Sequence, residues 1–314
     1  MHISPALIEQ RAERMLRERI TPAIHAESVP LTLTAWQAPG EPVPFAHAAA
    51  QDYEPIRPGD PWGPPWGTTW LHATGVVPDG WRRREGHRVE LVVDLGFTDT
   101  QPGFQAEGLL RRADGSAIKA VSPFNRAADW EDEPDAVDVY IEAASNPDVA
   151  GGFGFAPTPL GYRETAGDDP LYRLRRVDMA LRDLTVWELV QDLTVLLELA
   201  AGLPEDSTRR ARIDVALERA VDRVDPRDVG GTAAAARAEL ADVLAAPASA
   251  SAHHAVAVGH AHIDSAWLWP VRETVRKCVR TFSSVLALMD ADPDFVFACS
   301  SAQQYAWVKE DQPE

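Results

Sequence analysis

The sequence is poor in cysteine, in basic side chains and in long apolar runs, and each shortage excludes a class of protein. Its two cysteines, Cys278 and Cys299, give neither a disulfide framework nor a closely spaced metal-binding pair, so we expect buried thiols in a reducing compartment. Thirty Lys and Arg against 48 Asp and Glu leave a formal charge of −18, which disfavours a sequence-independent nucleic-acid surface. A neutral or cationic partner fits this charge better.

No run approaches the roughly 18 uncharged apolar residues of a spanning helix. The N-terminus carries charge throughout and lacks the apolar core of a signal peptide. We therefore expect a cytoplasmic protein that binds no membrane. The sequence leaves the oligomeric state open, and a homo-oligomer is compatible with it.

The length of 314 residues predicts two or three domains, because it exceeds the size of most single cores. Residues 1–29 form the first segment, in which Ser4 and Pro5 make a good helix start. Apolar residues then recur on one side at helical spacing. They are Ile8, Ala12, Met15 and Leu16. The chain is expected to open with one amphipathic helix.

Residues 30–182 contain short runs in which apolar and polar residues alternate. In "RVELVVDL" (88–95) the apolar side chains share one face, which predicts a half-buried strand. Residues 31–36, 68–77 and 137–143 read in the same way. Asp114-Gly115 lies where a hairpin turn is needed. We expect a β-sandwich, a jelly roll of the galactose-binding-like type.

A cluster of tryptophans in "GDPWGPPWGTTW" (59–70) allows two interpretations. Trp62, Trp66 and Trp70 could stack on a sugar from a sandwich loop, which would make this a non-catalytic carbohydrate-binding or assembly module. Aromatic residues in such loops more often fill the edge of a core or a domain interface.

Residues 183–250 return to helical periodicity. A helix is expected at about 184–201, a second in "RRARIDVALERAVDRV" (209–224) and an alanine-rich third at 232–244. Small residues at 246–254 look like a linker, so the segment is interpreted as a helical connector.

Residues 251–314 begin a new unit. "HAVAVGH" (254–260) is a candidate buried strand, residues from Val275 to Met289 have helical spacing, and "FVFACS" (295–300) is a second strand. Ser301 could cap a final helix. Strand, helix, strand, helix is the opening of a parallel α/β fold, so the whole chain is expected to be a multidomain α+β protein ending in the first βα units of an incomplete α/β barrel. In such folds the site lies at the carboxyl ends of the strands.

The loop at 260–269 has the residue types of a metal and sugar site. In an extended segment His262 and Asp264 lie on one side and can converge on one cation. Zinc accepts imidazole nitrogen and carboxylate oxygen, and a catalytic zinc needs about three protein ligands. His260 with His262 is an equally available pair, and a metal-dependent amidohydrolase would use it. Trp267 and Trp269 offer flat faces for a sugar ring.

The helix after this loop carries several charges. Glu273 and Arg276, three residues apart, are interpreted as a surface or packing pair rather than as catalytic groups. Arg272, Lys277 and Arg280 give a basic face, which is expected to be solvated.

The segment "GHAHIDSAWLWPVRETVRKCVRTF" (259–282) closely resembles the start of the catalytic barrel in glycoside hydrolase family 38 α-mannosidases, in the branch with bacterial and cytosolic members. The upstream segments 61–75, 102–110 and 148–161 resemble the N-terminal region of that branch, so the resemblance covers essentially the whole chain. It implies a catalytic divalent cation, normally Zn²⁺, one per complete active site. It also implies an α-mannoside or oligosaccharide substrate, with hydrolysis of terminal α-mannosides by retention of configuration.

Carried over residue by residue, the resemblance makes His262 and Asp264 metal ligands and Trp267 the wall beside the sugar at the cleavage point. His260 stays unassigned. A retaining glycosidase needs two carboxylates roughly 5 Å apart. The nucleophile and the acid/base of the family are expected downstream of Glu314, so no catalytic residue is assigned in this chain. We expect the 314 residues alone to be inactive.

Overall fold

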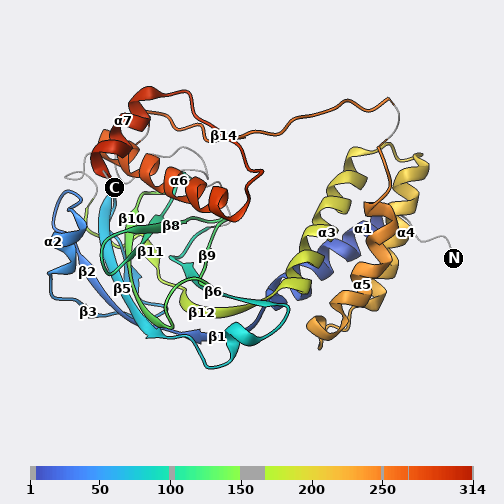
Figure 1. Ribbon diagram of the computed structural model, residues 1–314, viewed down its shortest axis with the longest axis horizontal. Coiled ribbons are helices and arrows are strands. Elements are labelled where there is room, and N and C mark those ends of the chain that lie inside the picture. Colours follow the sequence, from blue (N-terminus) through green and yellow to red (C-terminus); the bar gives the residue numbers. More distant parts are fainter. Residues whose placement is uncertain (1–4, 99–102, 149–166, 249–250, 268, 313–314) are drawn as a thin grey trace. The chain divides into compact units, whose positions relative to one another are not determined.

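The computed structural model describes residues 5–98, 103–148, 167–248, 251–267 and 269–312 (Figure 1). The predicted helix start at Ser4 and most of segment 148–161 lie outside these ranges. Residue contacts group the chain into two compact units. The first comprises residues 1–28, 79–90 and 180–255, and the second comprises residues 29–78, 91–179 and 256–314. Each unit is described by itself.

Within the described residues, twelve short strands lie between His25 and Asp183, where alternation was predicted. They are β1 (His25–Pro30), β2 (Thr32–Gln37), β3 (Glu54–Pro55), β4 (Pro61–Trp62), β5 (Gly67–Val76), β6 (His87–Asp94), β7 (Glu107–Arg112), β8 (Ala117–Val121), β9 (Ala127–Asp129), β10 (Ala136–Ser145), β11 (Tyr172–Arg173) and β12 (Arg176–Asp183). The helix α2 (Phe45–Ala49) and the 3₁₀ turn η3 (Trp81–Arg83) interrupt them. The four strands predicted from alternation are confirmed as β2, β5, β6 and β10.

The larger sheet has the order β3-β2-β5-β10-β7-β8, and a four-stranded sheet has the order β1-β12-β6-β9. The two central strands of the larger sheet, β5 and β10, pair antiparallel along their whole length. β7 and β8 form the predicted hairpin, in which Gly115 has φ +92° and the Asp114 carboxylate accepts a 2.8 Å hydrogen bond from the Ser116 amide. Helices and antiparallel sheets together make the chain a multidomain α+β protein, as predicted.

The strand β6 differs from the prediction in one respect, because both of its faces are buried. Glu90 is only 3% exposed and lies on the face predicted to be solvated. His25 Nε2 lies 2.5 Å from its carboxylate and Arg182 Nη1 lies 3.1 Å from it, and these partners compensate the buried charge. The prediction of a half-buried strand is therefore wrong.

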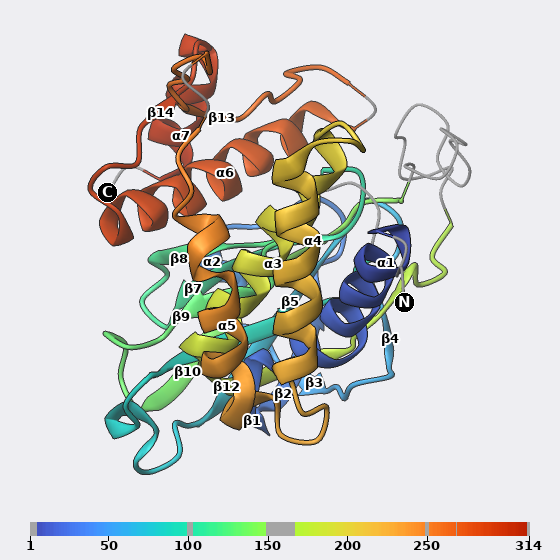
Figure 2. The ribbon, with the colours of Figure 1, turned by 90° about the vertical axis from the view of Figure 1, so that its right-hand side faces the viewer.

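Four helices build the first unit around a core of its own. They are α1 (Pro5–Met15), α3 (Leu184–Gly202), α4 (Thr208–Arg223) and α5 (Val229–Leu244), and a π-helical turn η1 (Leu16–Ile20) and a 3₁₀ turn η2 (Thr21–Ile24) follow α1. Figures 1 and 2 show α3, α4 and α5 side by side with α1 against them. The three helices predicted after residue 183 are thus present and belong to the same compact unit as α1.

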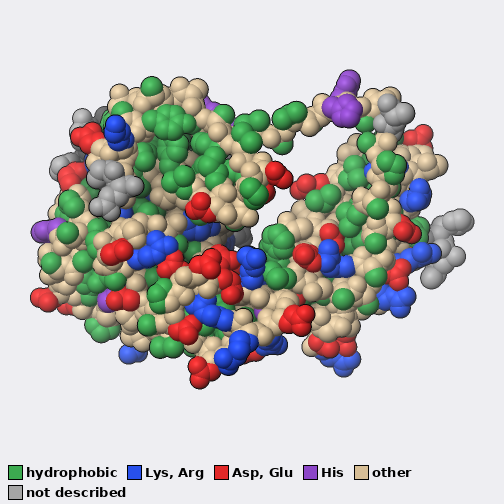
Figure 3. All heavy atoms as spheres, in the orientation of Figure 1, with side chains coloured by type: hydrophobic (Ala, Val, Ile, Leu, Met, Phe, Trp, Pro, Cys, Tyr) green, Lys and Arg blue, Asp and Glu red, His purple; other side chains and the backbone are tan. Residues whose placement is uncertain are grey.

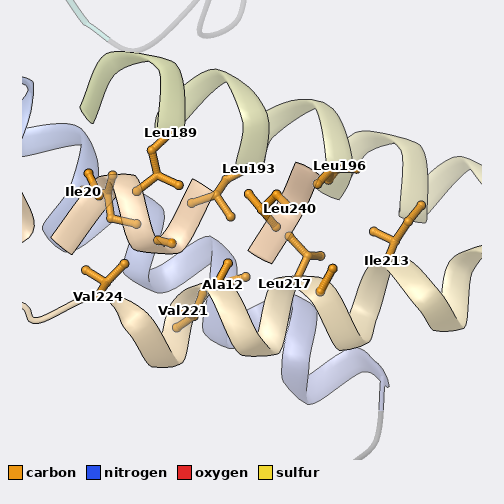
Figure 4. Close-up of a cluster of buried hydrophobic side chains, with 14 of the residues drawn as sticks. Ala12, Ile20, Leu189, Leu193, Leu196, Ile213, Leu217, Val221, Val224 and Leu240 are labelled. Atoms are coloured by element: carbon orange, nitrogen blue, oxygen red, sulfur yellow. The ribbon is translucent and has the colours of Figure 1, made fainter. Parts of the chain in front are cut away.

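The apolar stripes read from the sequence meet inside this unit (Figure 4). Ile8 and Ala12 of α1, Leu189 of α3 and Leu217 of α4 are buried together, with alanines of α5 allowing close approach. Side-chain caps start all three later helices, from Asp183, Ser207 and Asp228. No described helix has the length and apolar character that crossing a bilayer requires.

The second unit ends in the order β13 (Gly259–His260), α6 (Val271–Ala291), β14 (Phe297–Ala298) and α7 (Ala302–Asp311). β13 and β14 pair in parallel, which confirms the predicted parallel α/β arrangement. Ser301 does precede α7, but its side chain makes no capping hydrogen bond.

The expected buried strand at 254–260 is wrong over most of its length. Val256 is 90% and Val258 48% exposed, and only the last two residues of the run are in a strand. The physical reason is the absence of covering groups, since β13 has a partner on one side only among the described residues. Leu286 of α6 is also 60% exposed, and Figure 3 shows hydrophobic side chains gathered on the surface over α6 and α7.

Candidate functional site

The loop between β13 and α6 lies at the carboxyl end of a parallel strand pair. β13 ends at His260, and α6 begins directly after Pro270. Proline has no backbone N–H to donate, so it is tolerated at the start of a helix, where that group would have no partner within the helix. Since β14 runs parallel to β13, the segment that follows it reaches the same edge. The loop and the segment after β14 therefore lie at one edge of this strand pair, which is where the sequence predicts a site.

His262 and Asp264 converge as their spacing predicts. His262 Nε2 lies 3.1 Å from Asp264 Oδ1. The His262 side chain is 80% exposed and that of Asp264 is 36% exposed, so both can reach a ligand from solvent. His260 is exposed at the end of β13. Across the ranges that the structure describes, no three His, Cys, Asp or Glu side chains gather as a metal site.

The two tryptophans of the loop have different surroundings. Trp267 is 49% exposed, which leaves a ring face open. Trp269 is held in place, because its Nε1 donates to Thr274 Oγ1 at 2.9 Å and Lys277 Nζ lies 4.6 Å from its ring centroid. Trp267 is therefore the tryptophan with a face available to a ligand, while Trp269 packs in the structure.

Gln304 is a loop contact that the sequence analysis did not single out. It belongs to the first turn of α7, is 4% exposed and donates from Nε2 to Ile263 O at 2.8 Å. On the α6 side, Thr274 Oγ1 donates to Ser265 O at 3.2 Å. Both helices thus hold the backbone of the loop between its candidate ligands and its tryptophans. Its place just after β14, at the carboxyl edge of the parallel pair, is the signal that could have singled out Gln304.

The helix α6 packs on the larger sheet through a buried ionic cluster. The cluster has three carboxylates and four cations: Glu107, Glu142 and Glu273, with Arg111, Arg276, Lys277 and Arg280. Lys277 Nζ lies 2.6 Å and Arg280 Nε 2.8 Å from the Glu107 carboxylate on β7. Arg276 Nε lies 2.9 Å from Glu142 on β10. The cluster therefore joins the helix that follows the loop to the sandwich.

This cluster overturns the prediction of a solvated basic face. Lys277 is 5% and Arg280 4% exposed, and both are buried because carboxylates on the sheet compensate their charge. Only Arg272 fits the prediction in part, with an ion pair at 2.6 Å to Glu41, whose side chain is 67% exposed. Glu273 and Arg276 form the predicted packing pair at 3.1 Å.

Glu273 is the central anion of the cluster. Burial by itself would raise its pKa, but Arg280, Arg276 and Lys277, with a hydrogen bond from Asn146 Nδ2 at 2.8 Å, outweigh that effect and lower the pKa to about 2. Glu273 is therefore ionised at neutral pH and fully engaged with its partners. This argues for a structural role and against a catalytic one.

Of the two thiols, Cys278 is fully buried in α6, and burial raises its pKa to about 11. Cys299 is only partly buried, so the expectation of two buried thiols holds for one of them.

The sandwich tryptophans belong to the core. Trp62, Trp66 and Trp70 are 4%, 8% and 1% exposed. Trp62 Nε1 donates to Leu95 O at 2.7 Å, and its ring stacks on Tyr172 with centroids 5.4 Å apart. None of the three presents a free face, so this structure does not support the sugar-stacking interpretation.

Comparison with known proteins agrees with this organisation. A family model described as the α-mannosidase jelly-roll domain matches residues 29–180, and the glycosyl hydrolases family 38 N-terminal domain matches residues 252–314. One solved structure, a β-glucuronidase of Faecalibacterium prausnitzii, aligns with a TM-score of 0.30 and 13% identity over 50% of this chain and 31% of that one, too weak a likeness for any argument.

Curated relatives match over most of the chain. Alpha-mannosidase 2C1 of Mus musculus is 33% identical over 92% of this chain and 27% of its own length, and the Homo sapiens protein of that name is 31% identical over 87% and 25%. The alpha-mannosidase of Saccharomyces cerevisiae is 30% identical over 81% and 23%. The chain thus spans about a quarter of the length of these relatives. It belongs to the glycoside hydrolase family 38 α-mannosidases and corresponds to an N-terminal portion of such a protein.

Proposed function

We propose that this chain is part of a zinc-dependent, retaining α-mannosidase that acts on terminal α-mannosides, and that it supplies two ligands of the metal site. The observation that carries the proposal is the convergence of His262 Nε2 and Asp264 Oδ1 at 3.1 Å, at the carboxyl end of β13, within the segment matched by the family 38 domain. The relatives are named α-mannosidases, which supports a mannoside as the substrate.

The two side chains fit a divalent metal. Zinc binds imidazole nitrogen and carboxylate oxygen at about 2.0–2.2 Å, so two ligand atoms on a tetrahedral ion lie roughly 3.3–3.5 Å apart. The observed 3.1 Å needs only a slight opening of the pair to admit the ion. A bound ion would act as a Lewis acid that orients and polarises an oxygen of the sugar. His262 and Asp264 would hold it, and their exposure leaves room for further ligands.

Trp267 is proposed to flank the sugar. Its half-exposed ring follows Asp264 by three positions, and a flat aromatic face packs on the apolar C–H face of a pyranose. Trp269 supports this role indirectly, because its contacts with Thr274 and Lys277 fix the end of the same loop.

The 314 residues alone are expected not to turn over substrate. Two protein ligands fall short of the three that a catalytic zinc needs, and a retaining mechanism requires two carboxylates roughly 5 Å apart at the sugar. The only carboxylate placed on this loop is Asp264, which is assigned to the metal.

Two measurements test the proposal. Zinc titration of the purified chain by calorimetry should give a binding event that the variant His262→Ala loses, while His253→Ala, an exposed histidine of the linker, keeps it. Unchanged zinc affinity in His262→Ala would refute the ligand role. An aryl α-mannoside incubated with the zinc-loaded chain should release no phenol above the protein-free rate, and turnover would refute the expectation of inactivity.

A further inference from the structure

Gln304 of α7 is buried against the loop that carries His262 and Asp264. Its Nε2 donates to Ile263 O at 2.8 Å and lies 3.4 Å from Ser265 Oγ. Its Oε1 accepts from Cys299 Sγ at 3.3 Å, at the end of β14. A single amide thus joins the loop after β13 to the segment after β14.

The carbonyl that Gln304 binds belongs to the residue between the two candidate ligands. In an extended segment, side chains two apart share a side only while the intervening peptides keep their orientation. The His262 side chain is 80% exposed, so packing cannot fix its direction. What orders the pair must therefore act on the backbone, and Gln304 contacts that backbone at Ile263.

Resting on the proposed metal site, we propose that Gln304 is a positioning residue that orients the 263–264 peptide so that His262 and Asp264 converge on one cation. An amide suits this task because it donates to Ile263 O and accepts from Cys299 at once. A carboxylate of the same size could accept but not donate. Removal of the donor would also leave a carbonyl in a largely buried contact without its partner.

Mutating a residue that orients a metal ligand from outside typically lowers metal affinity by about 10–100-fold, and we expect a loss of this size for Gln304. The variants are Gln304→Ala and the isosteric Gln304→Glu. The matched control is Gln303→Ala, its exposed neighbour on the same helix. Each is studied in the full 314-residue chain with zinc alone as the probe.

Two readouts separate positioning from general stability. In the metal-free chain, the backbone amide NMR resonances of residues 261–266 should shift in both Gln304 variants, while those of α6 keep their wild-type positions. Zinc affinity measured by calorimetry should fall about 10–100-fold in both. Gln303→Ala should change neither.

The inference is overturned if the Gln304 variants match Gln303→Ala in both readouts, or if the resonances shift equally throughout α6 and α7, which would show a merely structural contact. If zinc binding by the wild-type chain does not depend on His262, the proposed function fails separately. The metal-free resonances of residues 261–266 then decide alone whether Gln304 orders this loop.

Discussion

Replacing Glu273 by glutamine should destabilise the second unit strongly, although the side chain keeps its size. Glu273 is 3% exposed and contacts Arg276, Arg280 and Asn146. The glutamine amide keeps one oxygen acceptor but carries no charge, so the buried cations around it lose the carboxylate that neutralises them. Removing one partner of a buried ion pair typically costs about 3–5 kcal/mol, because an uncompensated charge stays buried.

The pKa of Glu273 gives a second route to the magnitude. A carboxyl whose pKa falls from 4.5 to about 2 on folding contributes about 3 kcal/mol at neutral pH, since each tenfold change in proton affinity is worth ~1.36 kcal/mol. The folded-state pKa is the lower one, so this stability is complete above about pH 5 and is lost as the pH falls through 4.5 toward 2. The difference between wild type and Glu273→Gln should shrink over that interval.

Urea unfolding followed by tryptophan fluorescence measures the effect, because eight of the ten tryptophans lie in the second unit. The matched control is Glu41→Gln, which removes the charge of an exposed carboxylate that pairs with Arg272 of α6. This variant should lower the free energy of unfolding by at most about 1 kcal/mol. If Glu273→Gln is no more destabilising than Glu41→Gln at pH 7, or if the difference persists unchanged at pH 3, the account of the ionic cluster is refuted.

Two further predictions concern a thiol and a turn. Burial raises the pKa of Cys278, so this thiol should resist iodoacetamide at pH 8 while Cys299 reacts. Mass spectrometry of the labelled native protein measures the modification of each cysteine. Equal labelling of the two would contradict the assigned burial. Gly96→Ala should lower the free energy of unfolding by about 1–3 kcal/mol more than Gly40→Ala. Both glycines have positive φ, but only at Gly96 would an added Cβ lie 2.3 Å from a backbone oxygen, that of Arg173. Equal melting temperatures of the two variants would contradict this prediction.

Local features of the fold were predictable because they depend on nearby residues. The two-residue period placed β5 and β10, the three- and four-residue period placed α4, and Asp114-Gly115 placed the hairpin turn. The spacing of His262 and Asp264 likewise predicted that they share one side of an extended segment.

Features that depend on distant partners were not predictable. Lys277 and its partner Glu107 on β7 are 170 positions apart in the sequence. No residue near Lys277 indicates that this carboxylate lies next to it in the fold, so the basic residues of α6 were predicted to be solvated. Acidic residues inside strands β7 and β10, opposite a helix with cations at 276, 277 and 280, are a signal that could have been used. The buried Glu90 was missed for the same reason, since His25 and Arg182 compensate it from other segments.

The central claim is that His262 binds the metal together with Asp264 and not with His260. Zinc affinities of Asp264→Asn and His260→Ala, measured by calorimetry on the 314-residue chain, test it most directly. We predict at least a tenfold loss for Asp264→Asn and a change within about twofold for His260→Ala. The reverse ranking would contradict the claim and favour the His260 and His262 pair of a metal-dependent amidohydrolase.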